Sequence, residues 1–249
     1  MLLALRTVAA PVIAVVLLFA PLSLGEAQAQ ARPDAPRAVS GQGSFSFGVG
    51  VPTGAFNDNI DQLGYGAHLS LAALFADTPF SIGFDVSFLT FGRSTRNVPF
   101  SETVGSAVRV DVVTTSSVVQ PHLTLRMQPP AGLVRPYIEG VFGFKYLFTD
   151  TRVEDERGDE EAIARSRNFD DFTLSGGAGA GVHIRLVQNL NSDRANPVGP
   201  LYLKAGAQYL LGREAEYLDI SDGYDPDNPD VRRSATNMFM PMVGLALQF

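Results

Sequence analysis

Three absences limit what this chain can be. It has no cysteine, which excludes disulfides, thiolate metal sites and thiol catalysis. It has no tryptophan, although 17 Phe and 7 Tyr supply large flat side chains. Positive charge is in the minority, with 19 Lys and Arg against 26 Asp and Glu, which argues against a nucleic-acid backbone as a partner. After the first thirty residues no apolar run is long enough for a spanning helix, so further membrane contact would require strands.

The first thirty residues are typical of a secretory signal peptide. One positive charge at Arg6 precedes an apolar run over residues 7–24, and a small-x-small site follows at residues 27–29. We therefore expect a signal peptide over residues 1–29, with a cut after Ala31 as an alternative and an uncleaved membrane helix as the rival interpretation. Residues 30–42 are then expected to be a flexible mature N-terminus, and residues 43–249 a single domain.

Strict alternation of apolar and small or polar residues predicts strands. The stretch FSIGFDVSFLTF (residues 80–91) sets Phe80 and Ile82 on one face and Ser81 and Asp85 on the other. Eight regions have this period, and no region predicts a convincing helix. They are residues 44–51, 64–75, 80–91, 119–128, 136–148, 172–186, 201–211 and 238–249. In the fourth region the apolar parity changes. This predicts either a bulge near residues 115–118 or an upper part of the strand that lies outside any bilayer.

The polar face decides which side of these strands faces lipid. Its charged residues and histidines all share one parity and stand among Gly, Ser and Ala, the residues that fit inside a narrow barrel. The outside of a soluble barrel would instead be rich in Lys, Glu and Thr. We predict that the apolar face contacts lipid and that a structural polar network fills the lumen: His68, Asp85, His122, Arg126, Glu139, Lys145, His183, Arg185 and Lys204.

The links between the predicted strands alternate in length. Those after the first, third, fifth and seventh regions are long and polar, including residues 149–171 and 212–237. Those at residues 76–78 and 129–134 are short, and the link at residues 188–200 is intermediate. This alternation is typical of an all-β, eight-stranded, antiparallel, up-and-down transmembrane β-barrel with loops at one end and turns at the other.

These features together resemble small outer-membrane barrels of the OmpA/OmpX-like superfamily. The resemblance lies in the signal peptide, the eight alternating strands and the terminal ALQF, where Phe249 follows apolar Leu247 and Leu245. It implies a Gram-negative outer-membrane location, contact with outer-membrane lipid and lipopolysaccharide, and Phe249 as the signal read by the barrel-assembly machinery. The predicted barrel extends to the last residue, so we expect no counterpart of the peptidoglycan-binding domain that OmpA itself carries.

The long links suggest a surface role. Residues 150–171 hold nine acids against four arginines, and residues 213–233 hold seven acids against three. An extracellular ligand or a divalent cation at these acidic loops is one hypothesis, although residues 222–230 lack the spacing of an EF-hand. The alternative interpretation is a solvated, repulsive loop tip.

Catalysis and conduction are the competing hypotheses. His68 and Ser70, two residues apart, with Asp85 on the next strand, resemble the nucleophile pair of barrel lipid A deacylases, but their parity points into the lumen. A narrow channel would need a gap in an interior that eight strands normally fill. A soluble lipocalin-like binder is the remaining alternative. We expect a non-enzymatic barrel without a cofactor or metal, acting through structure or surface interaction.

Overall fold

The computed structural model describes residues 39–60, 62–99, 109–155, 164–188, 199–218 and 231–249. The predicted signal peptide, the predicted flexible segment up to residue 38 and the most acidic parts of the two long links lie outside these residues. No helix in the described part of the chain is long and apolar enough to cross a membrane.

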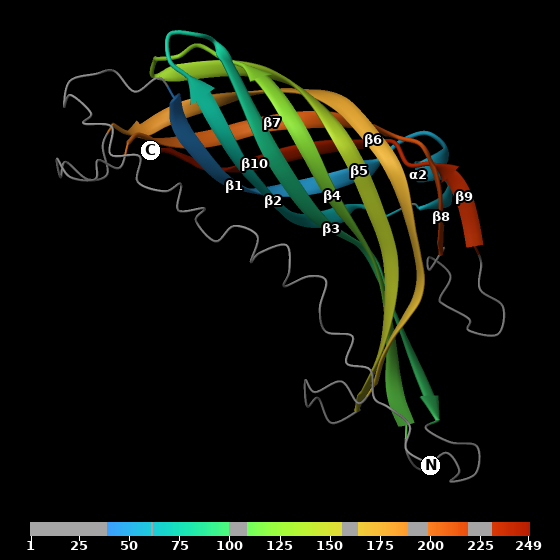
Figure 1. The fold of residues 1–249 in the computed structure, drawn as a ribbon. Coiled ribbons are helices and arrows are strands. Elements are labelled where there is room, and N and C mark those ends of the chain that lie inside the picture. Colours follow the sequence, from blue (N-terminus) through green and yellow to red (C-terminus); the bar gives the residue numbers. More distant parts are fainter. Residues whose placement is uncertain (1–38, 61, 100–108, 156–163, 189–198, 219–230) are drawn as a thin grey trace, which may run out of the picture. The chain divides into compact units, whose positions relative to one another are not determined.

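Eight strands form a closed antiparallel barrel (Figure 1). Each pairs with its neighbour in the sequence, and the barrel closes where the first strand pairs with the last, Phe45 opposite Leu245. The barrel strands are β1 (Val39–Pro52), β2 (Gly64–Phe75), β3 (Phe80–Pro99), β4 (Arg109–Met127), β5 (Val134–Asp155), β6 (Ala164–Val187), β7 (Leu201–Gly212) and β10 (Met238–Gln248). The predicted fold class is therefore confirmed.

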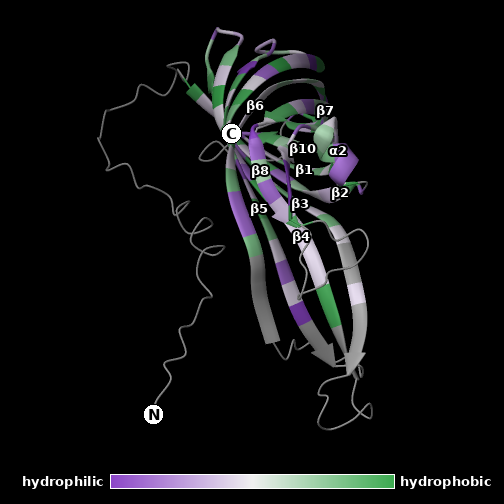
Figure 2. Ribbon diagram, turned by 90° about the vertical axis from the view of Figure 1, so that its right-hand side faces the viewer, coloured by the Kyte–Doolittle hydropathy of each residue, from purple (hydrophilic) through white to green (hydrophobic). Residues whose placement is uncertain are grey.

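The wall is apolar outside and polar inside. In β3, Phe80, Ile82 and Phe88 are about half exposed, at 48%, 51% and 46%, whereas Asp85 and Ser87 are each 1% exposed. Figure 2 shows the resulting alternation of hydrophobic and hydrophilic residues along the strands. Exposed Phe, Leu and Ile on every side of a closed wall match the lipid-facing surface of a membrane barrel, and each strand has the roughly 9–11 residues that a crossing needs.

One side of the barrel continues past the other. Strands β3 to β6 have 19 to 24 residues, whereas β1, β2, β7 and β10 have 11 to 14. The last β2 residue that pairs with β3 is Gly64, opposite Phe91, so β3 continues beyond it. The described ends of β3, β4, β5 and β6 therefore form a four-stranded sheet beyond the barrel, which we call the extension (Figure 1).

The extension corrects the prediction that residues 149–171 form one long loop. Strand β5 continues to Asp155 and β6 begins at Ala164, paired through Thr151 opposite Ser166. The sequence no longer alternates between apolar and polar residues there, yet the pairing of the backbones continues. Strand β1 also begins earlier than predicted. It starts at Val39, within the predicted flexible N-terminus, and Ser40 pairs there with Leu74 of β2.

The predicted bulge is at the expected level but on the neighbouring strand. Strand β4 keeps one register with β5 throughout, whereas the register of β3 with β4 shifts between Phe91 and Arg93. The extra residue is Gly92, whose φ of 65° lies in the left-handed region that glycine adopts without a Cβ clash. Thr115 and Ser116 are its cross-strand neighbours, so the prediction that the bulge lies in β4 was wrong.

Two of the long links contain short elements that cover the outer mouth. Helix α2 (Ala55–Asn59) lies in the first link, and β8 (Glu214–Leu218) pairs with β9 (Val231–Ala235) as a two-stranded sheet in the last. The short helix differs from the expectation that the chain has none. It carries one large apolar residue, Phe56, which packs against the barrel end, and too few residues to show helical periodicity.

Candidate functional site

The lumen holds the predicted polar residues. Eight of the nine are no more than 5% exposed: His68, Asp85, His122, Arg126, Glu139, Lys145, His183 and Lys204. Arg185 is half-buried, because the register of β6 with β7 shifts between Arg185 and Val187 at the short-turn end of the barrel.

An ion pair lies at the centre of the lumen network. Arg126 and Glu139 are direct cross-strand partners in the register of β4 and β5. The Arg126 Nε and Nη2 atoms each lie 2.8 Å from Glu139 Oε2, and Gln208 Nε2 donates to Glu139 Oε1 at 2.8 Å. Gly179 leaves the space for this contact, since a Cβ there would meet Glu139 Oε1 at 3.0 Å. The guanidinium also lies 4.8 Å from the ring centre of Tyr137.

The structure pairs His68 with Ser87. His68 Nδ1 and Ser87 Oγ are 2.9 Å apart, and His68 Nε2 lies 3.9 Å from Asp85 Oδ2. Thr124 donates to the same Asp85 oxygen at 2.5 Å. Ser70, the partner considered from the sequence, is opposite Asp85 in the register and is 5% exposed. These side chains face the lumen, on the opposite side of the wall from the lipid-facing surface.

The three histidines stay apart. His122 Nε2 lies 3.2 Å from Ser175 Oγ, and His183 Nδ1 lies 3.1 Å from Gln128 Oε1, while His68 contacts Ser87. Within the described ranges, no group of three or more His, Cys, Asp or Glu side chains is placed to hold a metal ion.

Sequence reasoning missed several lumen residues. Arg135 is fully buried, but the strand was predicted to begin one residue later, at Pro136. Tyr137 and Tyr202 are 3% exposed, and neither was assigned to a face from the sequence. The signal was available as parity, because Arg135 and Tyr137 precede Glu139 at intervals of two.

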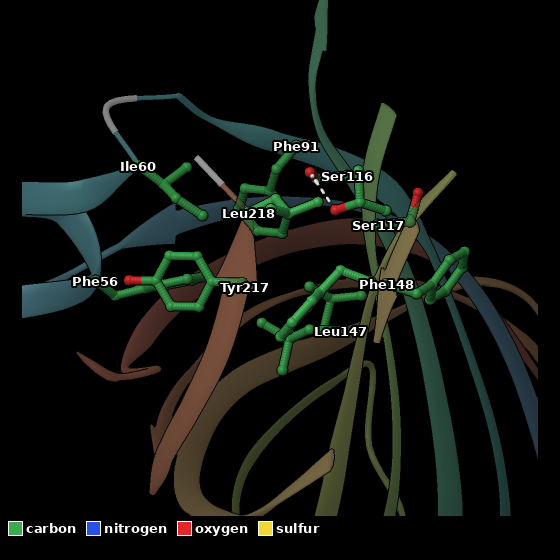
Figure 3. A pocket seen from close by; sticks show the side chains of 12 residues that line it. Phe56, Ile60, Phe91, Ser116, Ser117, Leu147, Phe148, Tyr217 and Leu218 are labelled. Carbon is green, nitrogen blue, oxygen red and sulfur yellow. Dashed lines mark hydrogen bonds between the residues drawn. The ribbon is translucent and has the colours of Figure 1, made fainter. Parts of the chain in front are cut away.

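Apolar side chains close the outer mouth (Figure 3). Phe56 of α2 packs edge-on against Tyr217 of β8 and against Phe91 of β3, with ring centres 5.3 Å and 6.0 Å apart. The Tyr217 hydroxyl accepts a hydrogen bond from Asn59 Nδ2 at 2.9 Å and lies 2.6 Å from Ser234 Oγ. Phe56, Phe91 and Tyr217 are at most 4% exposed. We call this group of three the aromatic cap.

The cap and the network fill the two parts of the lumen differently. Below the cap, Leu210 and Met238 continue the apolar cluster, and Lys145 donates to the backbone oxygen of Thr236. Further from the mouth the side chains are polar. The described interior thus consists of an apolar outer seal above a packed layer of charges and amides, with four buried cations (Arg126, Arg135, Lys145, Lys204) and two buried carboxylates (Asp85, Glu139).

Comparisons with known proteins address the fold. No family model and no curated protein matches the chain. Among solved structures it is similar to Neisserial surface protein A (10% identity, TM-score 0.39, covering 85% of this chain and 96% of that one). It is also similar to Ail of Yersinia pestis, solved with the heparin analogue sucrose octasulfate (14% identity, TM-score 0.34, covering 85% of this chain and 97% of that one). A third similar structure is a major outer membrane protein of Thermus thermophilus (15% identity, TM-score 0.41, covering 84% of this chain and 99% of that one).

The structure has the architecture that the sequence predicts. Its closed eight-stranded wall and apolar exterior are the architecture of a membrane-spanning β-barrel, consistent with a location in the outer membrane.

Proposed function

We propose that this protein spans the outer membrane as a sealed, non-enzymatic barrel and presents the extension outside the cell to a protein partner. The observation that carries the proposal is the extension itself. Residues 93–99 of β3 pair with β4 on one side, and no described strand pairs with them on the other. At ~3.3 Å per residue this free edge is roughly 23 Å long.

A free strand edge binds partners through its backbone. Its unpaired N–H and C=O groups accept an extended segment of another protein as an additional strand. The sealed barrel supports this role over conduction, because the aromatic cap closes the outer mouth. Below the cap, Arg126 pairs with Glu139, which also accepts a hydrogen bond from Gln208. Acidic loop tips that bind a ligand or a divalent cation remain a prediction, since residues 156–163 and 219–230 lie outside the described part.

The absence of cysteine makes the location and orientation directly measurable. Thr95 in the extension and Ala76 in the turn between β2 and β3 are both exposed and lie at opposite ends of β3. We expect a membrane-impermeant maleimide to label Thr95→Cys on intact cells, and Ala76→Cys only after the outer membrane is permeabilised. Labelling of both variants in a soluble periplasmic fraction would contradict the proposal and favour the lipocalin-like alternative.

The interaction itself is tested by shortening both hairpins of the extension. Arg93 and Thr115 are cross-strand partners, as are Thr149 and Phe169, so Asn-Gly turns can replace residues 94–114 and 150–168 without leaving the β5 end as a new free edge. Cells that express the full chain are expected to adhere to protein-coated surfaces more strongly than cells with the shortened chain. Equal adhesion by the two would contradict the role of the extension. Discrete single-channel steps from the full chain in a planar bilayer would instead favour the channel.

A further inference from the structure

A cavity lies at the short-turn end of the barrel, opposite the aromatic cap. Its volume is ≈ 190 Å³, well above the ~10–15 Å³ that one water molecule needs on the same measure. The start of β1, the β2–β3 turn, the β4–β5 turn and the end of β10 all contribute to its lining. Its polar lining residues are Ser40, Asp77, Thr78, Gln128, Arg135 and Gln248. We call it the turn-end cavity.

Arg135 is the cation of this cavity. Its side chain is fully buried, with Nε donating to the Pro129 backbone oxygen at 2.8 Å. Nη1 donates to the Tyr202 hydroxyl at 3.1 Å and to Gln248 Oε1 at 3.2 Å. These bonds fix the plane of the guanidinium. Its third nitrogen, Nη2, is buried and has no hydrogen-bond partner among the described residues.

A second donor lines the same cavity. The Gln128 carboxamide oxygen contacts His183 Nδ1 at 3.1 Å, which orients the amide, while Gln128 Nε2 is buried without a partner in the described part of the chain. Buried donors in folded proteins are almost always paired, so two unpaired donors on residues that line one cavity point to a ligand that accepts hydrogen bonds.

The charge around Arg135 selects an anion. No carboxylate of the described residues lies within ion-pair distance of its guanidinium, whereas Arg126 has Glu139. A buried charge without a counter-charge is strongly unfavourable. Asp77 is the acid that lines the cavity, and it is exposed on the β2–β3 turn, where it opposes an anion only through solvent.

We propose that the turn-end cavity binds a phosphate-type oxyanion, whose oxygens accept hydrogen bonds from Arg135 Nη2 and Gln128 Nε2. Guanidinium and amide N–H groups suit this ligand because phosphate offers several acceptor oxygens and negative charge. Two sources carry that chemistry. One is free phosphate, and the other is a phospholipid headgroup, since exposed Phe75 and Phe80 of the lipid-facing surface also line the cavity. The lipid source alone rests on the outer-membrane location proposed above.

The test uses the full mature barrel refolded in a maltoside detergent free of phosphate. Calorimetric titration with sodium phosphate is expected to give saturable binding that weakens at least tenfold in Arg135→Met. Lys145→Met is the matched control, because it removes a buried cation ten residues further along β5 and is expected to change the affinity less than twofold. Equal affinity of Arg135→Met and the parent chain would overturn the proposal.

An exposed variant tests the same site without disturbing the core. Asp77 has a φ of 60°, a conformation that Asn adopts as readily, so Asp77→Asn removes the charge and keeps the turn. Removing one opposing charge at roughly 7 Å in water-like dielectric predicts about threefold tighter phosphate binding. Unchanged or weaker binding would count against the proposal even if Arg135→Met failed to fold.

The source is resolved by native mass spectrometry of barrels extracted from phosphatidylglycerol and phosphatidylethanolamine vesicles. A lipid retained by the parent chain and lost in Arg135→Met assigns the headgroup as the ligand. Phosphate binding without lipid retention assigns the free anion. If the chain binds no phosphate and also retains no lipid in an Arg135-dependent way, the proposal is overturned. The labelling of Thr95→Cys and Ala76→Cys would still report independently on the location of the barrel.

Discussion

The ion pair of Arg126 and Glu139 allows a quantitative test of how the lumen is stabilised. Both side chains are at most 5% exposed and their closest atoms are 2.8 Å apart. At an effective dielectric constant of ~20, attraction between unit charges at this distance is about 6 kcal/mol, part of which desolvation offsets. Removing either partner leaves the other as an unpaired buried charge. We expect Arg126→Met or Glu139→Leu alone to lower the free energy of unfolding by about 3–5 kcal/mol.

The double variant separates this electrostatic effect from packing. With both charges gone, the remaining loss is chiefly the bond that Gln208 donates to Glu139, worth about 1 kcal/mol. The double variant is therefore expected to lose only about 1–2 kcal/mol. The assay is guanidinium-chloride unfolding of the barrel in lipid vesicles, followed by far-ultraviolet circular dichroism and by the mobility difference between unboiled and boiled protein on gels.

Additivity would refute this reasoning. If the double variant lost the sum of the two single losses, or if each single variant lost less than about 1 kcal/mol, the pair would not act as a unit. Gln42→Met is the control, because Gln42 accepts a single 3.5 Å contact from Arg126 and should cost about 1 kcal/mol or less.

Three further changes test other parts of the wall. Leu123→Arg on the lipid-facing surface should lower the free energy of unfolding in vesicles by about 2–4 kcal/mol. A change near zero would contradict the contact of Leu123 with lipid. Gly181→Ala places a Cβ 2.4 Å from the Ala205 backbone oxygen and 2.5 Å from the Tyr137 hydroxyl, and it should lower the free energy of unfolding by about 1–3 kcal/mol. Gly140→Ala, with no atom within 4 Å, should lower it by well under 1 kcal/mol, and equal losses would contradict close packing on the lumen side of β6. Tyr217→Phe removes a hydroxyl of the aromatic cap and should lower the free energy of local opening of β8 by ~1 kcal/mol, which corresponds to about fivefold faster amide exchange in β8. Unchanged exchange would show that the hydrogen bonds of this hydroxyl do not hold β8 in place.

The period of two was sufficient to predict the barrel because both faces of each spanning strand are constrained. Lipid selects Phe, Leu and Ile outside, and the narrow lumen selects small residues and a few charges inside. Asp85 and Lys204 were therefore assigned to the interior from parity alone. The same signal ends where the wall leaves the lipid, since water accepts polar residues on both faces of a strand. This is why the extension was predicted as loops.

The alternating pattern does not predict which lumen side chains contact one another. The choice of Ser87 over Ser70 for His68 depends on the register of β2 with β3, which alternation does not fix. Arg135 was missed because the strand was predicted to begin at Pro136, although Arg135 shares the parity of Glu139 and β5 begins at Val134. The aromatic cap brings together Phe56 and Tyr217, which are 161 residues apart and belong to links whose composition resembles that of a solvated loop.

The unequal strand lengths have an evolutionary and practical consequence. The four long strands are consecutive in the sequence, and the closing pair, β1 and β10, belongs to the short set. Residues can therefore be added to or removed from the β3–β4 and β5–β6 hairpins in cross-strand pairs while the barrel closure and the ion pair of Arg126 with Glu139 keep their register. Such a barrel separates a fixed anchor from a variable projecting module, which makes it a natural scaffold for grafting and displaying foreign β-hairpins.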